Sequence, residues 1–253
     1  MKVTFLGTGT SQGIPVIGCD CAVCKSDDPR DNRLRTSIHI ETKGLSIIVD
    51  TGPDFRQQVL RANIRKLDAI LFTHQHKDHV AGLDDVRSFN FLQKKAMPVY
   101  GNLMTLQQLK VEFAYAFAED RYPGIPEIDL IEIENDVFRI ENIEILPILV
   151  MHHKLPVFGF RIDDFVYITD AKTISDSELK KAYNAKVLVL NALQQSPHLS
   201  HFTLMEALDV IAELQPEQAY LTHMGHRMGK HSSIDPTLPD NVSLAFDGLT
   251  FHL

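Results

Sequence analysis

Residues 73–79 read Thr-His-Gln-His-Lys-Asp-His and place four potential metal ligands within six positions, directly after an apolar run. If this segment is extended, the side chains of His74 and His76 share one face, whereas Asp78 and His79 can point to a neighbouring site. A single ion does not easily use four such ligands, but two ions about 4 Å apart can divide them. The stretch therefore predicts a two-metal centre at the end of a strand.

Two further ligand candidates come directly after strand-like apolar runs. Asp170 follows residues 165–169, and His223 follows residues 219–222. Packed strands hold ligand directions better than loops do, so strand ends that converge on one edge of a sheet suit a metal site. This recurrence argues against the simpler interpretation of residues 73–79 as a solvated histidine-rich loop.

A second cluster lies near the N-terminus, where Cys19, Cys21 and Cys24 place three thiols within six residues. Three cysteines cannot all pair with one another, so the cluster favours metal binding in a reducing compartment over a disulfide framework. The alternative is three reduced surface thiols without a metal. A tetrahedral zinc site needs four ligands, and we expect the fourth to be His226, which a turn after His223 could aim away from the catalytic pair. Weaker candidates for this fourth ligand are His231 and His252.

The composition of the 253-residue chain is that of an ordinary globular protein, with 44% hydrophobic and 23% charged residues. We expect one domain over residues 1–253. The formal net charge of −8 argues against broad binding of nucleic acid through a basic surface. No apolar run has the length of a signal peptide core or a membrane span, so we expect a cytoplasmic protein with no membrane partner.

Strand-like and helix-like segments alternate along the chain, which predicts an α/β fold. Helices are expected over Phe55–Ala62, Leu103–Ala118 and Thr203–Leu214, the last with an apolar stripe at helical spacing. The tail Val242–Phe251 predicts two paired strands around the turn dipeptide Asp247-Gly248. Further strands are expected over residues 3–6, 36–41, 46–49, 69–73, 129–134, 137–140, 143–150, 158–162, 165–168, 187–190 and 219–222.

The H-x-H-x-D-H motif of residues 74–79 resembles the signature of the metallo-β-lactamase superfamily, and Asp50-Thr51-Gly52 resembles the aspartate-glycine turn that precedes it. The resemblance extends along nearly the whole chain. It implies a four-layer αβ/βα sandwich with two catalytic divalent ions, Mn²⁺ or Zn²⁺, at one edge. The ligands that it implies are His74, His76 and His152 for the first ion, Asp78, His79 and His223 for the second, and Asp170 for both.

One ligand assignment leaves an alternative, because His152 and His153 are adjacent. The segment 152–160 resembles a family pattern in which the ligand histidine precedes a Gly-Lys-Leu-Pro run. That pattern favours His152 as the ligand. His153 would then line the substrate pocket.

Other features resemble one subfamily, the phosphodiesterases of phosphonate breakdown. These features are Gly7-Thr8-Gly9-Thr10, the cysteine triplet and Thr222-His223-x-x-His226. The resemblance implies a homodimer with one structural Zn²⁺ beside the catalytic pair. It also implies a small-molecule phosphodiester substrate such as 5-phosphoribosyl 1,2-cyclic phosphate, opened by a hydroxide that bridges the metals. The catalytic residues expected are Asp78 and His201, the latter as general acid, with His198 as the alternative acid.

Three competing functions remain open at this stage. A tRNA 3′ endonuclease, to which this subfamily is related, needs a long basic Gly/Pro-rich arm, and the sequence contains no such stretch. A lactonase or thioesterase of the same fold is disfavoured only by resemblance, since those enzymes lack the cysteine triplet. A non-catalytic metal-binding accessory protein would bind the metals but would cleave no diester.

Overall fold

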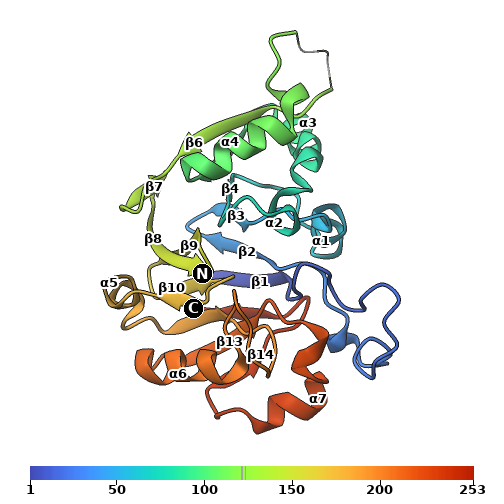
Figure 1. The fold of residues 1–253 in the computed structure, drawn as a ribbon. Coiled ribbons are helices and arrows are strands. Elements are labelled where there is room, and N and C mark those ends of the chain that lie inside the picture. The colour runs from blue at the N-terminus through green and yellow to red at the C-terminus, as the bar shows by residue number, and fades with distance from the viewer. Residues whose placement is uncertain (121, 123) are drawn as a thin grey trace.

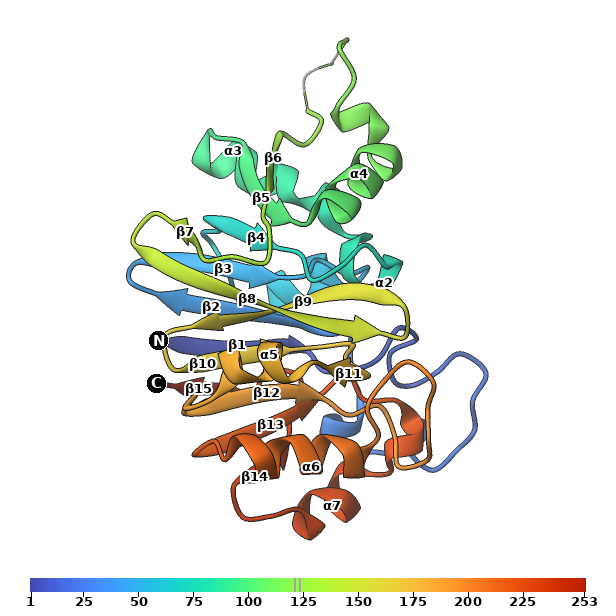
Figure 2. The ribbon, with the colours of Figure 1, turned by 60° about the vertical axis from the view of Figure 1, so that its left-hand side comes forward.

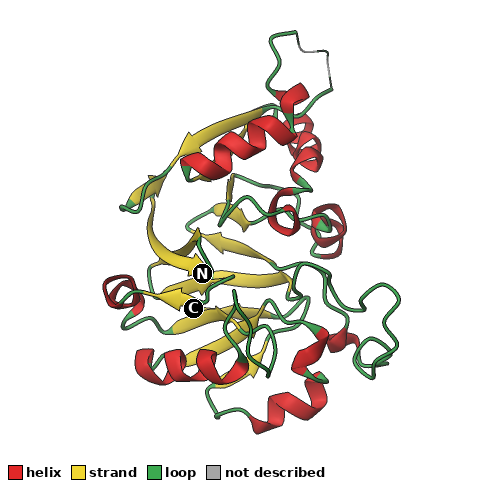
Figure 3. Cartoon of the chain, in the orientation of Figure 1, coloured by secondary structure: helices red, strands yellow, loops and turns green. Residues whose placement is uncertain are grey.

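A computed structural model of the chain describes residues 1–120, 122 and 124–253. Two β-sheets lie face to face in the middle, with α1 to α4 outside the first sheet and α5 to α7 outside the second (Figures 1 and 2). Figure 3 shows the same alternation of helix and strand layers. The predicted four-layer αβ/βα sandwich is confirmed.

The first sheet contains most of the N-terminal half of the chain. Its strand order is β15-β1-β2-β3-β4-β5-β6, and it is antiparallel from β15 to β3 and parallel from β3 to β6. Its strands are β1 (Lys2–Gly7), β2 (Ser37–Thr42), β3 (Leu45–Val49), β4 (Ala69–Leu71), β5 (Met97–Gly101), β6 (Ile128–Glu132) and β15 (Thr250–His252).

The second sheet has the order β11-β8-β9-β10-β12-β13-β14, and β7 pairs with β8 beside it. It is parallel from β10 to β14 and antiparallel elsewhere. Its strands are β7 (Phe138–Ile140), β8 (Ile143–His152), β9 (Leu155–Ile162), β10 (Phe165–Ile168), β11 (Thr173–Ile174), β12 (Val187–Asn191), β13 (Gln218–Thr222) and β14 (Val242–Leu244).

Helices connect the parallel strands and cover the outer faces of the sheets. Because β-strand side chains alternate between faces, a strand buried on both sides has apolar residues throughout. In β10, Phe165 and Tyr167 face the core between the sheets, whereas Val166 and Ile168 face the helices. The helices are α1 (Phe55–Arg61), α2 (Lys77–Val80), α3 (Arg87–Gln93), α4 (Leu103–Glu112), α5 (Asp176–Leu179), α6 (Leu204–Leu214) and α7 (His231–Ile234).

The best predicted helix is α6. Thr203 is its N-cap, and a capping box joins the Thr203 side chain to the backbone of Glu206 and the Glu206 side chain to the backbone of Thr203. The apolar stripe of the helix packs on the second sheet. By contrast, the helix predicted over Leu103–Ala118 ends at Glu112 and continues only as a 3₁₀ turn over Ala114–Ala116.

The prediction of paired strands in the tail is wrong. β14 pairs in parallel with β13 in the second sheet, and β15 pairs with β1 in the first, so the two strands belong to different sheets. The turn at Asp247-Gly248 exists, but it crosses between the sheets. The Asp247 carboxylate accepts hydrogen bonds from the Thr8 hydroxyl and the Leu34 N–H, so it joins distant parts of the chain instead of closing a hairpin.

Candidate metal centre

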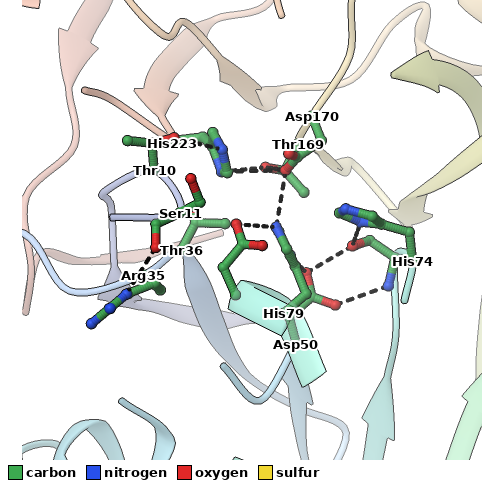
Figure 4. A network of polar contacts seen from close by, with 12 residues as sticks. Thr10, Ser11, Arg35, Thr36, Asp50, His74, His79, Thr169, Asp170 and His223 are labelled. Carbon is green, nitrogen blue, oxygen red and sulfur yellow. Dashed lines mark hydrogen bonds and ion pairs between the residues drawn. The ribbon is translucent and has the colours of Figure 1, made fainter. Parts of the chain in front are cut away.

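Four of the predicted ligands, His74, His79, Asp170 and His223, meet at one edge of the sandwich, where strands of both sheets end (Figure 4). His74 comes soon after β4, Asp170 after β10 and His223 directly after β13. All three strands have parallel neighbours. In α/β folds the loops after the carboxyl ends of parallel strands commonly form binding sites.

Histidine and carboxylate atoms form three overlapping groups in the described part of the chain, each with its ligand atoms within 4.8 Å of one another. Asp170 belongs to two of them, which fits a residue shared by two ions. One group consists of the three residues that the sequence assigned to the second ion alone. The groups are His74 with His79 and Asp170, Asp78 with His79 and His223, and His152 with Asp170 and His201.

His76 lies beside these groups but in none of them. Its ring centroid is 4.6 Å from that of His74 and 5.2 Å from that of His152, so its imidazole borders both of its predicted partners. The residue is exposed and precedes α2 as its N-cap. His76 thus lies on the solvent side of the cluster.

The structure distinguishes the two adjacent histidines at the end of β8. His152 points to the cluster, and its Nδ1 lies 2.8 Å from the Ser200 carbonyl oxygen, so this nitrogen donates and leaves Nε2 free. His153 is exposed in the turn to β9 with φ of 55°. The structure thus places His152, with its ring centroid 5.9 Å from that of His74 and 5.2 Å from that of His76, within the cluster.

Asp50 fixes the positions of Thr73 and His79 beside the other ligands. Its carboxylate accepts hydrogen bonds from the Thr73 N–H at 2.9 Å and the Thr73 hydroxyl at 2.8 Å, and it lies 2.7 Å from Nδ1 of His79. A carboxylate that holds one imidazole nitrogen leaves the other as the ligand atom, an arrangement common around protein-bound metals. The sequence singled out the Asp50 turn only by resemblance, without this contact.

The buried carboxylates and His79 stabilise one another's charges. Burial raises the intrinsic cost of ionising Asp170 and Asp78, but the neighbouring His223 and His79 hold the pKa of both carboxyls below the usual range. Burial also opposes a charge on His79, yet the carboxylates of Asp170, Asp78 and Asp50 raise its pKa well above the ordinary value. A cluster that recruits positive charge in this way is suited to cations.

Two buried nitrogen atoms in the cluster lack a hydrogen-bond partner among the described residues, Nε2 of His74 and Nδ1 of His201. A buried polar atom without a partner costs about 1–3 kcal/mol. Nε2 of His79 lies 3.3 Å from the carboxylates of Asp78 and Asp170, in ion-pair contacts rather than well-formed hydrogen bonds. These nitrogens, beside carboxylate oxygens, fit divalent metals that accept mixed N and O ligands.

His201 lies closer to the cluster than His198. Its Nδ1 is 3.8 Å from the Asp170 carboxylate, and its ring centroid is 4.4 Å from that of His152. The ring centroid of His198 is 5.2 Å from that of His201, and His198 belongs to none of the three ligand groups. Burial, with the charge of His223, lowers the pKa of His201 to about 3.

The backbone turns in an unusual way where the strands deliver these groups. Asp50, Asp170 and His223 have φ of 63°, 57° and 56°. This left-handed region is sparsely populated by residues other than glycine, and such residues concentrate at functional sites. At each position the chain changes direction as the strand ends, and the side chain joins the cluster.

Threonine hydroxyls around the ligands were missed in the sequence. Thr73 bonds to Asp50, Thr169 donates to the Asp170 carboxylate at 2.7 Å, and Thr10 lies 3.2 Å from Nε2 of His223. A signal was present, because a threonine precedes the ligand in Thr73-His74, Thr169-Asp170 and Thr222-His223.

The cysteine cluster forms a separate group with His226. Nδ1 of His226 lies 3.2 Å from the Cys19 sulfur and 3.5 Å from those of Cys21 and Cys24. In tetrahedral zinc with Zn–S of about 2.3 Å and Zn–N of about 2.0 Å, sulfur and nitrogen ligands lie about 3.5 Å apart. One nitrogen within 3.5 Å of three sulfurs fits a shared ion better than three hydrogen bonds. The weaker candidate His231 contacts the Arg33 guanidinium instead.

The fold and the edge cluster define the class of protein. The family described as Beta-lactamase superfamily domain matches residues 46–224. The chain therefore belongs to the β-lactamase superfamily, whose fold implies divalent metals.

Within this class, the chain is similar to a crystallised diphosphatase of the PhnP family. The two are 37% identical, with a TM-score of 0.93, over 100% of this chain and 97% of the other. Two more distant structures share the fold: Zn²⁺-bound PqqB from Methylobacterium extorquens, 17% identical with a TM-score of 0.81, and the short form of human tRNase Z, 17% identical with a TM-score of 0.71. They cover 100% of this chain and 100% and 99% of their own.

Curated relatives are longer than this chain. An octanoyltransferase from Porphyromonas gingivalis is 37% identical over 98% of this chain, which spans 51% of that protein. A ribonuclease Z from Staphylococcus epidermidis is 28% identical over 64% of this chain and 49% of its own length. The chain thus spans about half the length of the curated relatives that it matches. In the described residues, no helix combines the length and apolar character needed to cross a bilayer.

Proposed function

We propose that the chain is a metal-dependent phosphodiesterase that opens a small cyclic phosphate, such as 5-phosphoribosyl 1,2-cyclic phosphate. The observation that carries this proposal is the full-length similarity to the PhnP-family diphosphatase, at 37% identity and a TM-score of 0.93. The edge cluster supports it, because carboxylates and imidazoles that recruit positive charge suit two cations that would bind an anionic ester.

We assign the ligands as the sequence predicted them. His74, His76 and His152 would hold one ion, Asp78, His79 and His223 the other, and Asp170 both. We propose Mn²⁺ or Zn²⁺ for this pair and a structural Zn²⁺ for Cys19, Cys21, Cys24 and His226. Such a pair polarises a phosphoryl oxygen and makes water a better nucleophile.

The protein side chains would handle the leaving group. His201 lies at the open side of the cluster, next to Asp170. Its pKa of about 3 makes it neutral at neutral pH in the free protein. The negative charge of a bound phosphate favours the imidazolium, so His201 would gain its proton with the substrate and pass it to the departing alkoxide.

Two other activities are less well supported. Ribonuclease Z relatives match 64% of the chain at 28% identity, and the net charge of −8 disfavours a long RNA contact surface. The octanoyltransferase name belongs to a protein twice as long, of which this chain covers 51%. Neither finding favours acyl or RNA chemistry at the edge cluster.

The test is phosphorus NMR of the manganese-loaded protein with 5-phosphoribosyl 1,2-cyclic phosphate. We expect the cyclic diester signal to be replaced by that of one monoester. An unchanged diester signal, with both metals shown to be bound, would overturn the proposal. Linear diesters, thioesters, lactones and a precursor tRNA are then assayed in parallel, and turnover of one of these instead would identify the alternative.

A variant separates the site from a contaminating activity. Asp78→Ala removes a carboxylate that lies 3.3 Å from Nε2 of His79. Loss of a group that only orients a metal ligand costs about 10- to 100-fold, so loss of a proposed ligand should lower hydrolysis by about 100-fold or more. Circular dichroism should remain that of the folded protein. Retention of a near-normal rate by this variant would exclude the assignment of the second ion.

A further inference from the structure

A cleft of about 800 Å³ lies on the outer face of the first sheet and takes no part in the chemistry described so far. β3 begins beside it at Leu45 and ends at Val49, directly before Asp50. At about 3.3 Å per residue, this strand separates the cleft from the metal centre by about 16 Å. Figure 2 shows the same separation, with the start of β1 at the left end of the sandwich and α2 at the right. A ligand in this sheet-face cleft would therefore not touch the catalytic metals.

The floor of the sheet-face cleft consists of polar side chains from the antiparallel strands β15, β1, β2 and β3. Because side chains alternate between the faces of a strand, the residues between them enter the core between the sheets. Thr4, His39 and Ser46 are buried although they face outwards. A flat, solvated sheet face would leave such groups open to water, so their burial shows a true recess. The floor residues are Lys2, Thr4, His39, Glu41, Ser46 and His252.

Hydrogen bonds hold the two walls of the cleft in place. One wall is the loop after α1, residues 62–66, and the other is the turn between β2 and β3, residues 42–44. The Lys66 ammonium donates to the Gly44 carbonyl oxygen at 3.1 Å, and the Ser46 hydroxyl donates to the Lys66 carbonyl oxygen at 2.7 Å. The cleft is thus formed before a ligand arrives, and a preformed site loses little entropy on binding.

His39 presents an unused acceptor in the floor. The Ser46 hydroxyl has one proton, which it donates to the Lys66 carbonyl oxygen, so in the 2.7 Å contact between Ser46 and Nε2 of His39 the imidazole must donate. A neutral imidazole that donates from Nε2 accepts at Nδ1. In the described part of the chain, Nδ1 of His39 has no hydrogen-bond partner. A ligand that contacts it would therefore have to supply a hydroxyl or an N–H group.

Cations surround this acceptor, although the chain as a whole has a net charge of −8. Among the described residues that line the cleft, Glu41 is the one acidic side chain, and it is neutralised by Lys2 at 2.6 Å. The Nε of Arg65 donates to the Asn63 side-chain oxygen at 2.8 Å, whereas its terminal nitrogens have no partner among the described residues. The cleft thus favours an anion. The cations that line it are Lys2, Lys43, Arg65 and Lys66.

We infer that the sheet-face cleft binds a phosphorylated small molecule that also carries a hydroxyl group and has about the size of a nucleotide. A guanidinium offers a planar pair of donors that matches two phosphate oxygens, so Arg65 would hold the phosphate. The hydroxyl would donate to Nδ1 of His39. The volume of about 800 Å³ falls within the range of small-molecule sites. Nucleotides and hexose phosphates share this chemistry, and the inference does not depend on the proposed phosphodiesterase function.

Calorimetry on the manganese-loaded protein tests the site with AMP, glucose 6-phosphate and adenosine. We expect a phosphate ester to bind more tightly than adenosine, and the tighter of the two esters distinguishes a nucleotide from a sugar phosphate. Arg65→Gln should weaken this binding roughly 10- to 100-fold, as expected for one charged hydrogen-bonded contact. Arg56→Gln is the matched control, because Arg56 is an exposed arginine of α1 that does not line the cleft. It should bind the ester as the wild type does.

Two further comparisons locate the ligand. A deoxy form of the ester that binds should bind the wild type about 2- to 10-fold more weakly, since the hydroxyl contact with His39 is lost; equal affinities would overturn that contact. Asp78→Ala alters the metal centre and should keep the binding. Loss of binding in Asp78→Ala with full retention in Arg65→Gln would place the ester at the metals and overturn the inference. So would the absence of binding by both esters at millimolar concentration.

Discussion

At the scale of single residues, the contact between Asp50 and His79 determines which nitrogen of His79 is free. Asp50→Asn would present an amide N–H where the carboxylate accepted, and His79 would move its proton to Nε2. We expect metal affinity to fall about 10- to 100-fold, as for other groups that orient metal ligands. Metal content after dialysis is measured by plasma mass spectrometry.

A matched variant controls for loss of a nearby acid. Asp54→Asn removes a carboxylate four residues away that pairs with Arg35 at 3.0 Å and contacts no histidine of the cluster. It should keep the metal content of the wild type. Equal losses in both variants would show that Asp50 acts only through general stability.

A buried histidine far from the cluster predicts the response of stability to acid. Burial lowers the pKa of His39 to about 4, and its Nε2 donates to the Ser46 hydroxyl at 2.7 Å. The unfolded chain therefore binds a proton here below about pH 6.5, whereas the folded protein does so only near pH 4. Stability from this residue is present above pH 6.5 and is lost as pH falls towards 4, by on the order of 3 kcal/mol.

His39→Gln keeps a donor for Ser46 and removes the titration. Urea unfolding at several pH values should show a smaller loss of the free energy of unfolding between pH 6.5 and 4 in this variant than in the wild type. Parallel curves for the two proteins would refute the assignment to His39. His252→Gln, at an exposed histidine of β15, should leave the slope unchanged.

At the scale of elements, α6 was predicted from its apolar stripe, and the structure adds an N-cap at Thr203. Thr203→Ala removes the oxygen that accepts from the Glu206 N–H at 3.2 Å. The free energy of unfolding should fall by about 1 kcal/mol, the usual contribution of an N-cap. Thr203→Ser keeps the oxygen and should restore most of this loss in chemical denaturation, and an equal deficit in both variants would exclude the cap as the cause.

Long elements and the first ligands could be predicted because their signals are local. Strands such as β10 have continuous apolar runs, and the motif of residues 74–79 places its ligands within a few positions. The tail was mispredicted because Asp247-Gly248 has the composition of a hairpin turn, whereas strand pairing is decided by distant partners. The bond from Asp50 to His79 and the positive φ of the ligands also depend on tertiary contacts, so no local pattern reveals them.

At the scale of the whole molecule, the cysteine cluster joins residues that are about 200 positions apart. Cys19 and His226 are separated by 207 residues, and their contact ties the N-terminal loop to the segment after β13. A cross-link that closes so long a loop stabilises by restricting the unfolded chain. Cys21→Ser should therefore lose one zinc ion per chain and lower the Tm, measured by metal analysis and calorimetry. An unchanged zinc content would show that the cysteine cluster does not bind a metal ion.

The three left-handed residues that follow β3, β10 and β13 have a consequence for engineering. Each strained position costs about 1 kcal/mol that glycine would avoid. In the metal-free protein, Asp170→Gly should thus be more stable than Asp170→Ala by about this amount, because φ at this position is 57°. A laboratory selection for heat resistance alone would favour glycine at these positions. The selected variants would be more stable than the wild type but would no longer bind metal.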